Sequence, residues 1–169
     1  MKSIWAILFA GFATTAHADL FVEFIEGAPK DRFLITNVAH CDLPEFEIHL
    51  DLSTSQAGLI FDVSSSGAGV EVFQPLELIG QTDRVSSVTQ LMDGDNMVSL
   101  NMTGLKSGEM VGFTIDVDDT AGAVEITVAG SEISGALVKA NILGKELSDP
   151  FDQNGASQII GLYCNTNEA

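Results

Sequence analysis

The sequence predicts an all-β protein, an antiparallel β-sandwich. Short segments alternate between apolar and polar residues, which is the period of a half-buried strand. Turns rich in glycine, aspartate and asparagine separate these segments. No stretch combines sustained helical periodicity with capping residues. About ten short strands with turns between them are typical of a sandwich. A closed β-barrel buries its alternating faces in the same way and remains the alternative.

The first eighteen residues have the three parts of a secretory signal peptide. Lys2 gives a positive start, residues 4–13 are apolar, and Ala16-His17-Ala18 is a small-x-small cleavage site. We therefore expect cleavage after Ala18 and a secreted or periplasmic product that begins at Asp19. The apolar run is too short for a transmembrane helix, and no second long run follows. The sequence thus predicts no membrane span.

Residues 19–169 have the length and composition of one β-sandwich domain. About 150 residues is a usual domain size, and the whole chain is 46% hydrophobic. Its formal net charge is −17, and a chain this acidic is repelled by nucleic acid and by anionic lipid. The charge suits cations or basic partners. The alternative is that it only keeps the surface solvated.

The clearest predicted strand is residues 45–52, in which the two faces separate fully. The residues on the core face are Phe46, Ile48, Leu50 and Leu52. Those on the solvent face are Glu45, Glu47, His49 and Asp51. The other predicted strands, in chain order, are 20–26, 32–38, 58–63, 69–73, 75–79, 96–102, 110–117, 123–129, 132–142 and 157–163.

The predicted mature chain contains two cysteines, Cys41 and Cys164. An even pair in an exported protein suggests a disulfide. This disulfide would close a loop of roughly 120 residues, for which chain-entropy models give about 4–5 kcal/mol of stabilisation. The alternative is a reactive thiol at Cys41 with the neighbouring His40 as its base.

The segment FTIDVDDT, residues 113–120, places three acids within four positions. Phe113, Ile115 and Val117 alternate with polar residues and take the core face. The acids on or beside the other face are Asp116, Asp118 and Asp119. Asp116 and Asp118 should stand roughly 7 Å apart along one face of the strand. Strand-end carboxylates next to a turn resemble half of a calcium site, so these three acids are candidate calcium ligands. The alternative is a solvated strand end.

A second acidic turn, DGDN at residues 93–96, is a weaker candidate for cation binding through Asp93 and Asp95. It opens like a calcium loop but lacks the glycine and the distal glutamate of an EF-hand. The alternative is an Asx-turn in which Asp93 accepts a hydrogen bond from its own backbone.

Sequence signatures of enzymes are missing. The chain has no G-x-S-x-G, H-E-x-x-H or C-x-x-C motif and no phosphate-binding glycine loop. We therefore predict a non-catalytic protein. A hydrolase that uses two of the many carboxylates is the less favoured alternative.

Several segments together resemble a family of small secreted bacterial proteins that are described as similar to the aggregation factor core protein of sponges. The segments are residues 58–80, 93–95, 104–120 and 125–136. The sponge assemblies are extracellular and depend on calcium in cell adhesion. The resemblance implies an extracellular β-module that is linked to calcium, and it supplies no catalytic residue.

Together these observations predict a secreted, non-catalytic module for surface or matrix association or adhesion, linked to calcium. A carbohydrate- or small-ligand-binding module without metal is the alternative. The sequence names no partner, and an extracellular glycan or a surface protein is the candidate.

Overall fold

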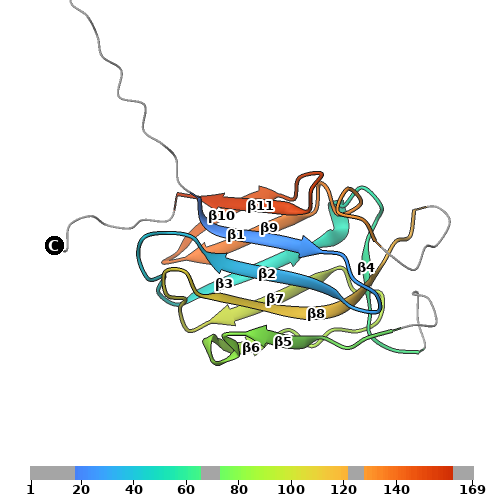
Figure 1. The fold of residues 1–169 in the computed structure, drawn as a ribbon, viewed down its shortest axis with the longest axis horizontal. Helices are drawn as coiled ribbons and strands as arrows, with labels where there is room; N and C mark the ends of the chain where they lie inside the picture. Colours follow the sequence, from blue (N-terminus) through green and yellow to red (C-terminus); the bar gives the residue numbers. More distant parts are fainter. Residues whose placement is uncertain (1–17, 66–72, 122–127, 162–169) are drawn as a thin grey trace, which may run out of the picture.

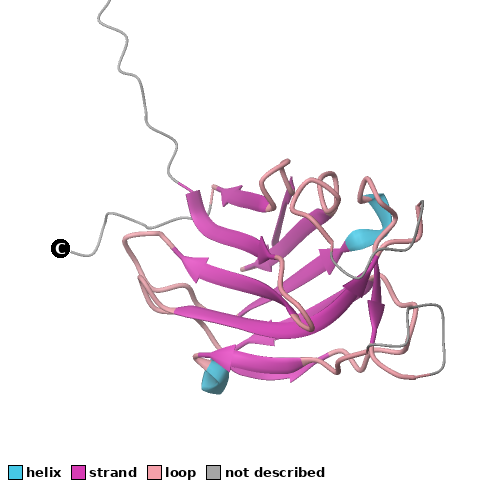
Figure 2. Cartoon of the chain, turned by 45° about the vertical axis from the view of Figure 1, so that its right-hand side comes forward, coloured by secondary structure: helices cyan, strands magenta, loops and turns pink. Residues whose placement is uncertain are grey.

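The computed structural model describes residues 18–65, 73–121 and 128–161, and it confirms the predicted sandwich. Two antiparallel sheets lie as two layers with their apolar faces together (Figures 1 and 2). In the described residues each sheet ends in edge strands, so the architecture is a sandwich and not a closed barrel.

The first sheet has six strands in the order β11–β1–β2–β8–β4, with β5 also pairing with β8. The strands are β1 (Ala18–Ile25), β2 (Asp31–Asn37), β4 (Ile60–Asp62), β5 (Glu77–Gly80), β8 (Met110–Asp118) and β11 (Ala156–Ile160). β5 pairs with the first half of β8, and β4 pairs with the second half. The two short strands therefore share one edge of β8.

The second sheet has five strands in the order β10–β9–β3–β7–β6. They are β3 (Phe46–Asp51), β6 (Val85–Val88), β7 (Met97–Met102), β9 (Leu137–Ile142) and β10 (Lys145–Pro150). Two short 3-10 turns, η1 (Leu52–Thr54) and η2 (Thr82–Arg84), complete the described elements. None of the described helical segments has the length and apolar character needed to cross a membrane.

The core lies between the sheets and is built around Phe33. Its ring stacks on Phe113 with 5.0 Å between centroids, and Phe24 lies 5.1 Å away. Phe61 and Phe151 approach it edge-on, each at 6.4 Å. Such aromatic pairs add to the free energy gained from burial. Every apolar residue predicted to face the core in β3 and β8 is buried.

The solvent face predicted for β3 is correct except at its end. Asp51 is buried, because its carboxylate accepts hydrogen bonds from Ser53 and pairs with Lys139 at 2.9 Å. The pair lets the acid leave water without becoming an isolated charge.

The structure corrects the predicted strands at two places and leaves two of them largely untested. The predicted strand 132–142 begins only at Leu137, because the residues before it form turns. Strands β6 and β10 were not predicted, since VSSV and KELSDP are short and largely polar edge sequences. The predicted strands 69–73 and 123–129 fall largely outside the described residues.

Candidate calcium site

The pairing of β4 with β8 places two aspartates directly opposite each other at one end of the first sheet. Asp62 lies directly opposite Asp116, and Ile60 lies opposite Asp118. Side chains directly opposite one another in an antiparallel pair share a face, as do residues two apart in one strand. Phe61 lies opposite Val117, and both are buried. The three carboxylates therefore occupy the face opposite to the core.

The loop before β7 adds a fourth aspartate, Asp93. This loop runs along β4, where Gly94 N–H donates to the Phe61 carbonyl at 3.0 Å. The Asp93 carboxylate accepts hydrogen bonds from the backbone N–H groups of Val63 at 3.0 Å and Ser64 at 3.3 Å. These contacts hold Asp93 beside the end of β4, and its carboxyl group interacts with that of Asp62. We call Asp62, Asp93, Asp116 and Asp118 the acidic cluster.

The acidic cluster is largely removed from solvent. Asp62 is 0% exposed, Asp118 1% and Asp116 6%, while Asp93 is half-buried. Neither carboxylate oxygen of Asp62 receives a hydrogen bond, and the same holds for Oδ2 of Asp116. Buried carboxylates are normally compensated by donors or by a cation. The cluster therefore contains more buried acceptor oxygens than the described residues have donors to match.

The electrostatics of the cluster follow from this shortage of donors. Burial, together with contact with the carboxyl groups of Asp93 and Asp118, raises the pKa of Asp62 to about 7. Burial also raises the pKa of Asp116 to about 6, assisted by the charge of Asp118. Like charges at close range and a dry environment both disfavour ionisation. Without a cation, the cluster therefore resists carrying its full negative charge at neutral pH.

Asp31 contacts the other edge of β8, where β2 pairs with it. It lies at the start of β2, is 3% exposed, and accepts hydrogen bonds from Val117 N–H at 3.1 Å and Gly27 N–H at 3.0 Å. Val117 stands between the two cluster residues of β8, so Asp31 helps fix that part of the strand. Burial raises the pKa of Asp31 to about 7, although the two N–H groups oppose the rise.

The predicted acids of residues 113–120 are all buried, so a solvated strand end is wrong for them. Asp116 and Asp118 belong to the acidic cluster. Asp119 is 7% exposed, and its Oδ1 receives no hydrogen bond. It is not among the charges that raise the pKa of Asp116, so we leave it outside the cluster.

The two acids of the DGDN turn, Asp93 and Asp95, accept hydrogen bonds from different parts of the chain. Asp93 does not close a local Asx-turn, because its carboxylate accepts hydrogen bonds from the backbone that follows β4, some thirty residues away in the sequence. Asp95 stays local, and its carboxylate accepts a hydrogen bond from Met92 N–H at 2.7 Å. Asp62 and Asp31 were not predicted as site residues from the sequence. The only available signal for Asp62 was its polar place in the alternating segment GLIFDV.

The acidic cluster has the ligand chemistry of a calcium site, although its carboxyl groups do not converge on a single position for an ion. Calcium takes carboxylate oxygens at about 2.3–2.6 Å. Within the described ranges, no three His, Cys, Asp or Glu side chains form a ready metal-binding group. The interactions run instead as a chain from Asp93 to Asp62, Asp118 and Asp116. Calcium binding remains a prediction.

The disulfide between Cys41 and Cys164 also remains a prediction. Cys41 is not a free thiol in the structure, but Cys164 lies outside the described residues, as does most of the predicted signal peptide. We expect no free thiol when the oxidised protein is denatured and titrated with a thiol reagent, and two after reduction. Two reactive thiols before reduction would contradict the pairing.

Comparisons with known proteins do not identify a family. No family model matches the sequence, and no curated protein matches it. Among solved structures, a family GH18 chitinase from Chromobacterium violaceum is similar, with 17% identity and a TM-score of 0.34. The match covers 82% of this chain but only 19% of the chitinase. A likeness this low carries no argument about activity.

Proposed function

We propose that the protein is a secreted, non-catalytic β-sandwich module that binds calcium at its acidic cluster. The observation that carries the proposal is Asp62, whose two carboxylate oxygens are fully buried and receive no hydrogen bond. Its polar neighbours are further carboxyl groups. A divalent cation supplies the positive charge that this arrangement lacks.

Calcium suits the cluster better than magnesium does. Calcium accepts six to eight oxygen ligands in irregular geometry, whereas magnesium requires a near-octahedral shell and gives up its water reluctantly. The cluster offers carboxylates from β4, from β8 and from the loop beside β4. Side chains from separate elements fit a tolerant coordination shell more easily. Binding would also tie the three segments together.

A two-carboxylate hydrolase is less well supported by the same geometry. A general acid and its partner in glycoside hydrolysis stand about 5–9.5 Å apart and must face a substrate. Asp62 and Asp118 interact directly and are 0% and 1% exposed. Neither carboxyl group is accessible to a substrate. The free-energy cost of ionising these buried groups therefore favours the binding of a cation.

The biological role that we propose is association with a surface or matrix outside the cell. The signal-like N-terminus and the resemblance of residues 58–136 to the sponge-type proteins support an extracellular setting. The net charge of −17 suits a protein that binds calcium and associates with basic or neutral partners.

Thermal unfolding of the mature protein tests calcium binding. At pH 8, calcium should raise the melting temperature in a saturable way, because a ligand specific for the native state adds RT ln(1 + [L]/Kd) of stability. At a hundredfold excess over Kd this is about 2.7 kcal/mol, or roughly 5–10 °C for a domain of this size.

Sodium chloride at equal ionic strength is the control, since it only screens charge, and magnesium should act more weakly than calcium. If calcium and matched sodium chloride give the same curve, the acidic cluster does not bind calcium.

A further inference from the structure

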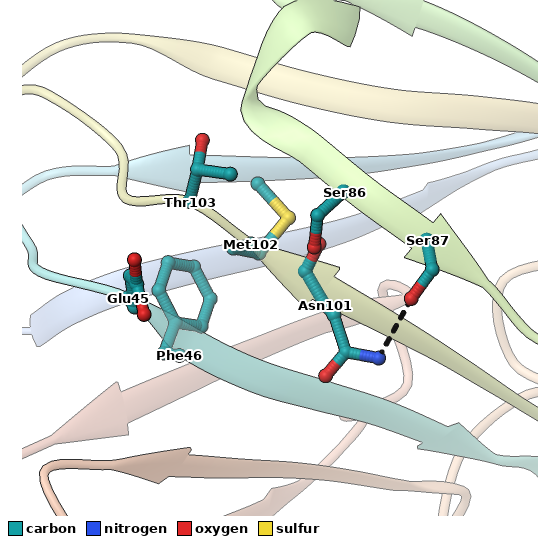
Figure 3. A pocket seen from close by; sticks show the side chains of 7 residues that line it. All are labelled: Glu45, Phe46, Ser86, Ser87, Asn101, Met102 and Thr103. Carbon is teal, nitrogen blue, oxygen red and sulfur yellow. Dashed lines mark hydrogen bonds between the residues drawn. The ribbon is translucent and has the colours of Figure 1, made fainter.

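An open groove on the outer face of the second sheet lies apart from the acidic cluster (Figure 3). It crosses β7 between the start of β3 and strand β6, and its volume is about 420 Å³. This lies within the usual size range of small-ligand sites. Seven residues line it: Glu45, Phe46, Ser86, Ser87, Asn101, Met102 and Thr103.

A β-bulge builds the hydroxyl-rich side of this groove. The pairing of β6 with β7 shifts register between Val85 and Ser87, so Ser86 is the extra residue. In a regular strand Ser86 and Ser87 would point to opposite faces. The bulge re-aims the chain, and both serines are exposed. Two neighbouring hydroxyl groups thereby border the same hollow.

Several polar groups of the groove use a hydrogen within the protein, while Ser87 keeps its hydroxyl hydrogen and Asn101 keeps a second amide hydrogen. Ser86 Oγ donates to the Asn101 carbonyl at 3.0 Å, and Thr103 Oγ1 donates to the Arg84 carbonyl at 3.2 Å. Asn101 Nδ2 donates to Ser87 Oγ at 3.0 Å, as Figure 3 shows. Each hydroxyl oxygen retains acceptor capacity after donating.

The groove is consequently rich in acceptors. The side-chain carbonyl of Asn101 points away from Ser87 in Figure 3, and the exposed carboxylate of Glu45 adds a further acceptor. Phe46 and Met102 lie opposite each other in the β3–β7 pairing. Both belong to the core and are only 5% and 3% exposed, so they present a small apolar surface to the groove. A complementary ligand offers several donors together with a C–H surface.

We infer that this groove binds an uncharged saccharide. The hydroxyl groups of a sugar can donate to the several acceptors of the groove and accept from Ser87 and Asn101, and the C–H face of its ring meets the small apolar surface. An anionic sugar would meet the Glu45 carboxylate and the negative charge of the protein. The only charged side chain in the lining is the exposed Glu45, so a cationic amine would find one weak, screened partner.

The second sheet offers a matched control for the groove. Asn101 on β7 and Asn141 on β9 lie on either side of Glu47 in the pairing of the three strands. Both are exposed, but Asn141 lines a different hollow with His49 and Lys139. Asn101→Ala and Asn141→Ala therefore make the same chemical change on the same face of the sheet, and only the first alters the groove.

The test is an NMR titration of the mature protein with maltotriose, cellotriose and mannotriose, in the presence of a calcium chelator. At least one neutral trisaccharide should shift the amide signals of Ser87, Asn101 and Thr103, with saturation. Asn101→Ala should weaken that binding about tenfold, as expected for losing a direct hydrogen bond to a ligand, and Asn141→Ala should leave it unchanged.

Three outcomes would overturn the inference. One is that none of the trisaccharides shifts these signals. Another is that both alanine variants weaken binding equally. The third is that spermidine or trigalacturonate shifts the same signals more strongly than any neutral sugar. Because calcium is chelated throughout, a failure here does not touch the proposed calcium site, and a failure of calcium binding does not touch the groove.

Discussion

Asp62→Asn is expected to stabilise the calcium-free protein at pH 8 and to remove most of its response to calcium. The substitution keeps the shape of the side chain and deletes a buried charge whose two oxygens receive no hydrogen bond. The new amide can also donate to the neighbouring carboxylates of Asp93 and Asp118, which interact with Asp62. Most substitutions of buried residues destabilise a protein, so a gain here would be an unusual and informative result.

The size of the expected gain follows from the pKa of Asp62, which burial and its acidic neighbours raise from 3.8 to about 7. One unit corresponds to about 1.4 kcal/mol of difference between the two protonation states. Neighbouring carboxylates share this cost, so we expect about 1–3 kcal/mol of stabilisation at pH 8, below the full figure for an isolated group. Chemical denaturation with a chelator present measures it.

Asp83→Asn is the matched control for this experiment. Asp83 lies exposed on η2 and outside the acidic cluster, and its substitution changes the net charge by the same amount. It should leave both the calcium-free stability and the calcium response near those of the parent protein. If the two variants respond alike, Asp62 has no special part in cation binding. A destabilised Asp62→Asn that still binds calcium would also contradict the proposal.

The sequence was sufficient to predict the sandwich and to name three of the four cluster aspartates, Asp116, Asp118 and Asp93, the last as a separate and weaker candidate. Period-two alternation is a local property, and it correctly placed Phe113, Ile115 and Val117 in the core. The same alternation put Asp116 and Asp118 together on the other face. It could not show that this face is buried at the strand end, because burial depends on which other segments cover it.

The assembly of the cluster depends on pairings between distant segments. Asp62 meets Asp116 only because β4 pairs with β8 across some fifty residues of sequence. Asp93 joins them through bonds to the backbone that follows β4. A three-residue strand such as β4 leaves little pattern to set its register, so a single sequence gives no reason to bring these acids together.

The bulge at Ser86 escaped prediction for a related reason. VSSV is short, and two adjacent exposed serines break the alternation by which strands are recognised. The irregularity that hides the strand in the sequence is what places both hydroxyl groups beside the groove. At the groove, local rules fail where the structure departs from a regular sheet, whereas at the acidic cluster they fail because the pairing of β4 with β8 is non-local. Such failures are common at functional sites.

Without calcium, the stability of the protein is expected to fall as the pH rises from 5 to 8. The folded-state pKa values of Asp62 and Asp31 are raised to about 7 and that of Asp116 to about 6, from 3.8. Between pH 4 and 7 the folded protein therefore holds more protons than the unfolded chain. Stability falls with rising pH wherever the native state binds more protons.

Other shifted carboxylates do not explain a slope in this range. The pKa values of Asp51, Glu109 and Asp152 are lowered, chiefly by hydrogen bonds that they accept. Their contribution to stability is present above the unfolded pKa of about 4 and is lost only as the pH falls below it. Between pH 5 and 8 it is nearly constant.

Saturating calcium should flatten this pH dependence, because calcium binds the ionised carboxylates and competes with protons for them. We expect a decrease of several °C in melting temperature from pH 5 to 8 with a chelator, and a much smaller decrease with calcium. A residual slope should remain, since Asp31 lies outside the cluster and burial is the main cause of its raised pKa. Melting curves at four pH values, each with chelator, calcium or matched sodium chloride, measure both slopes. Equal slopes in calcium and in sodium chloride would show that the buried aspartates titrate without binding the ion.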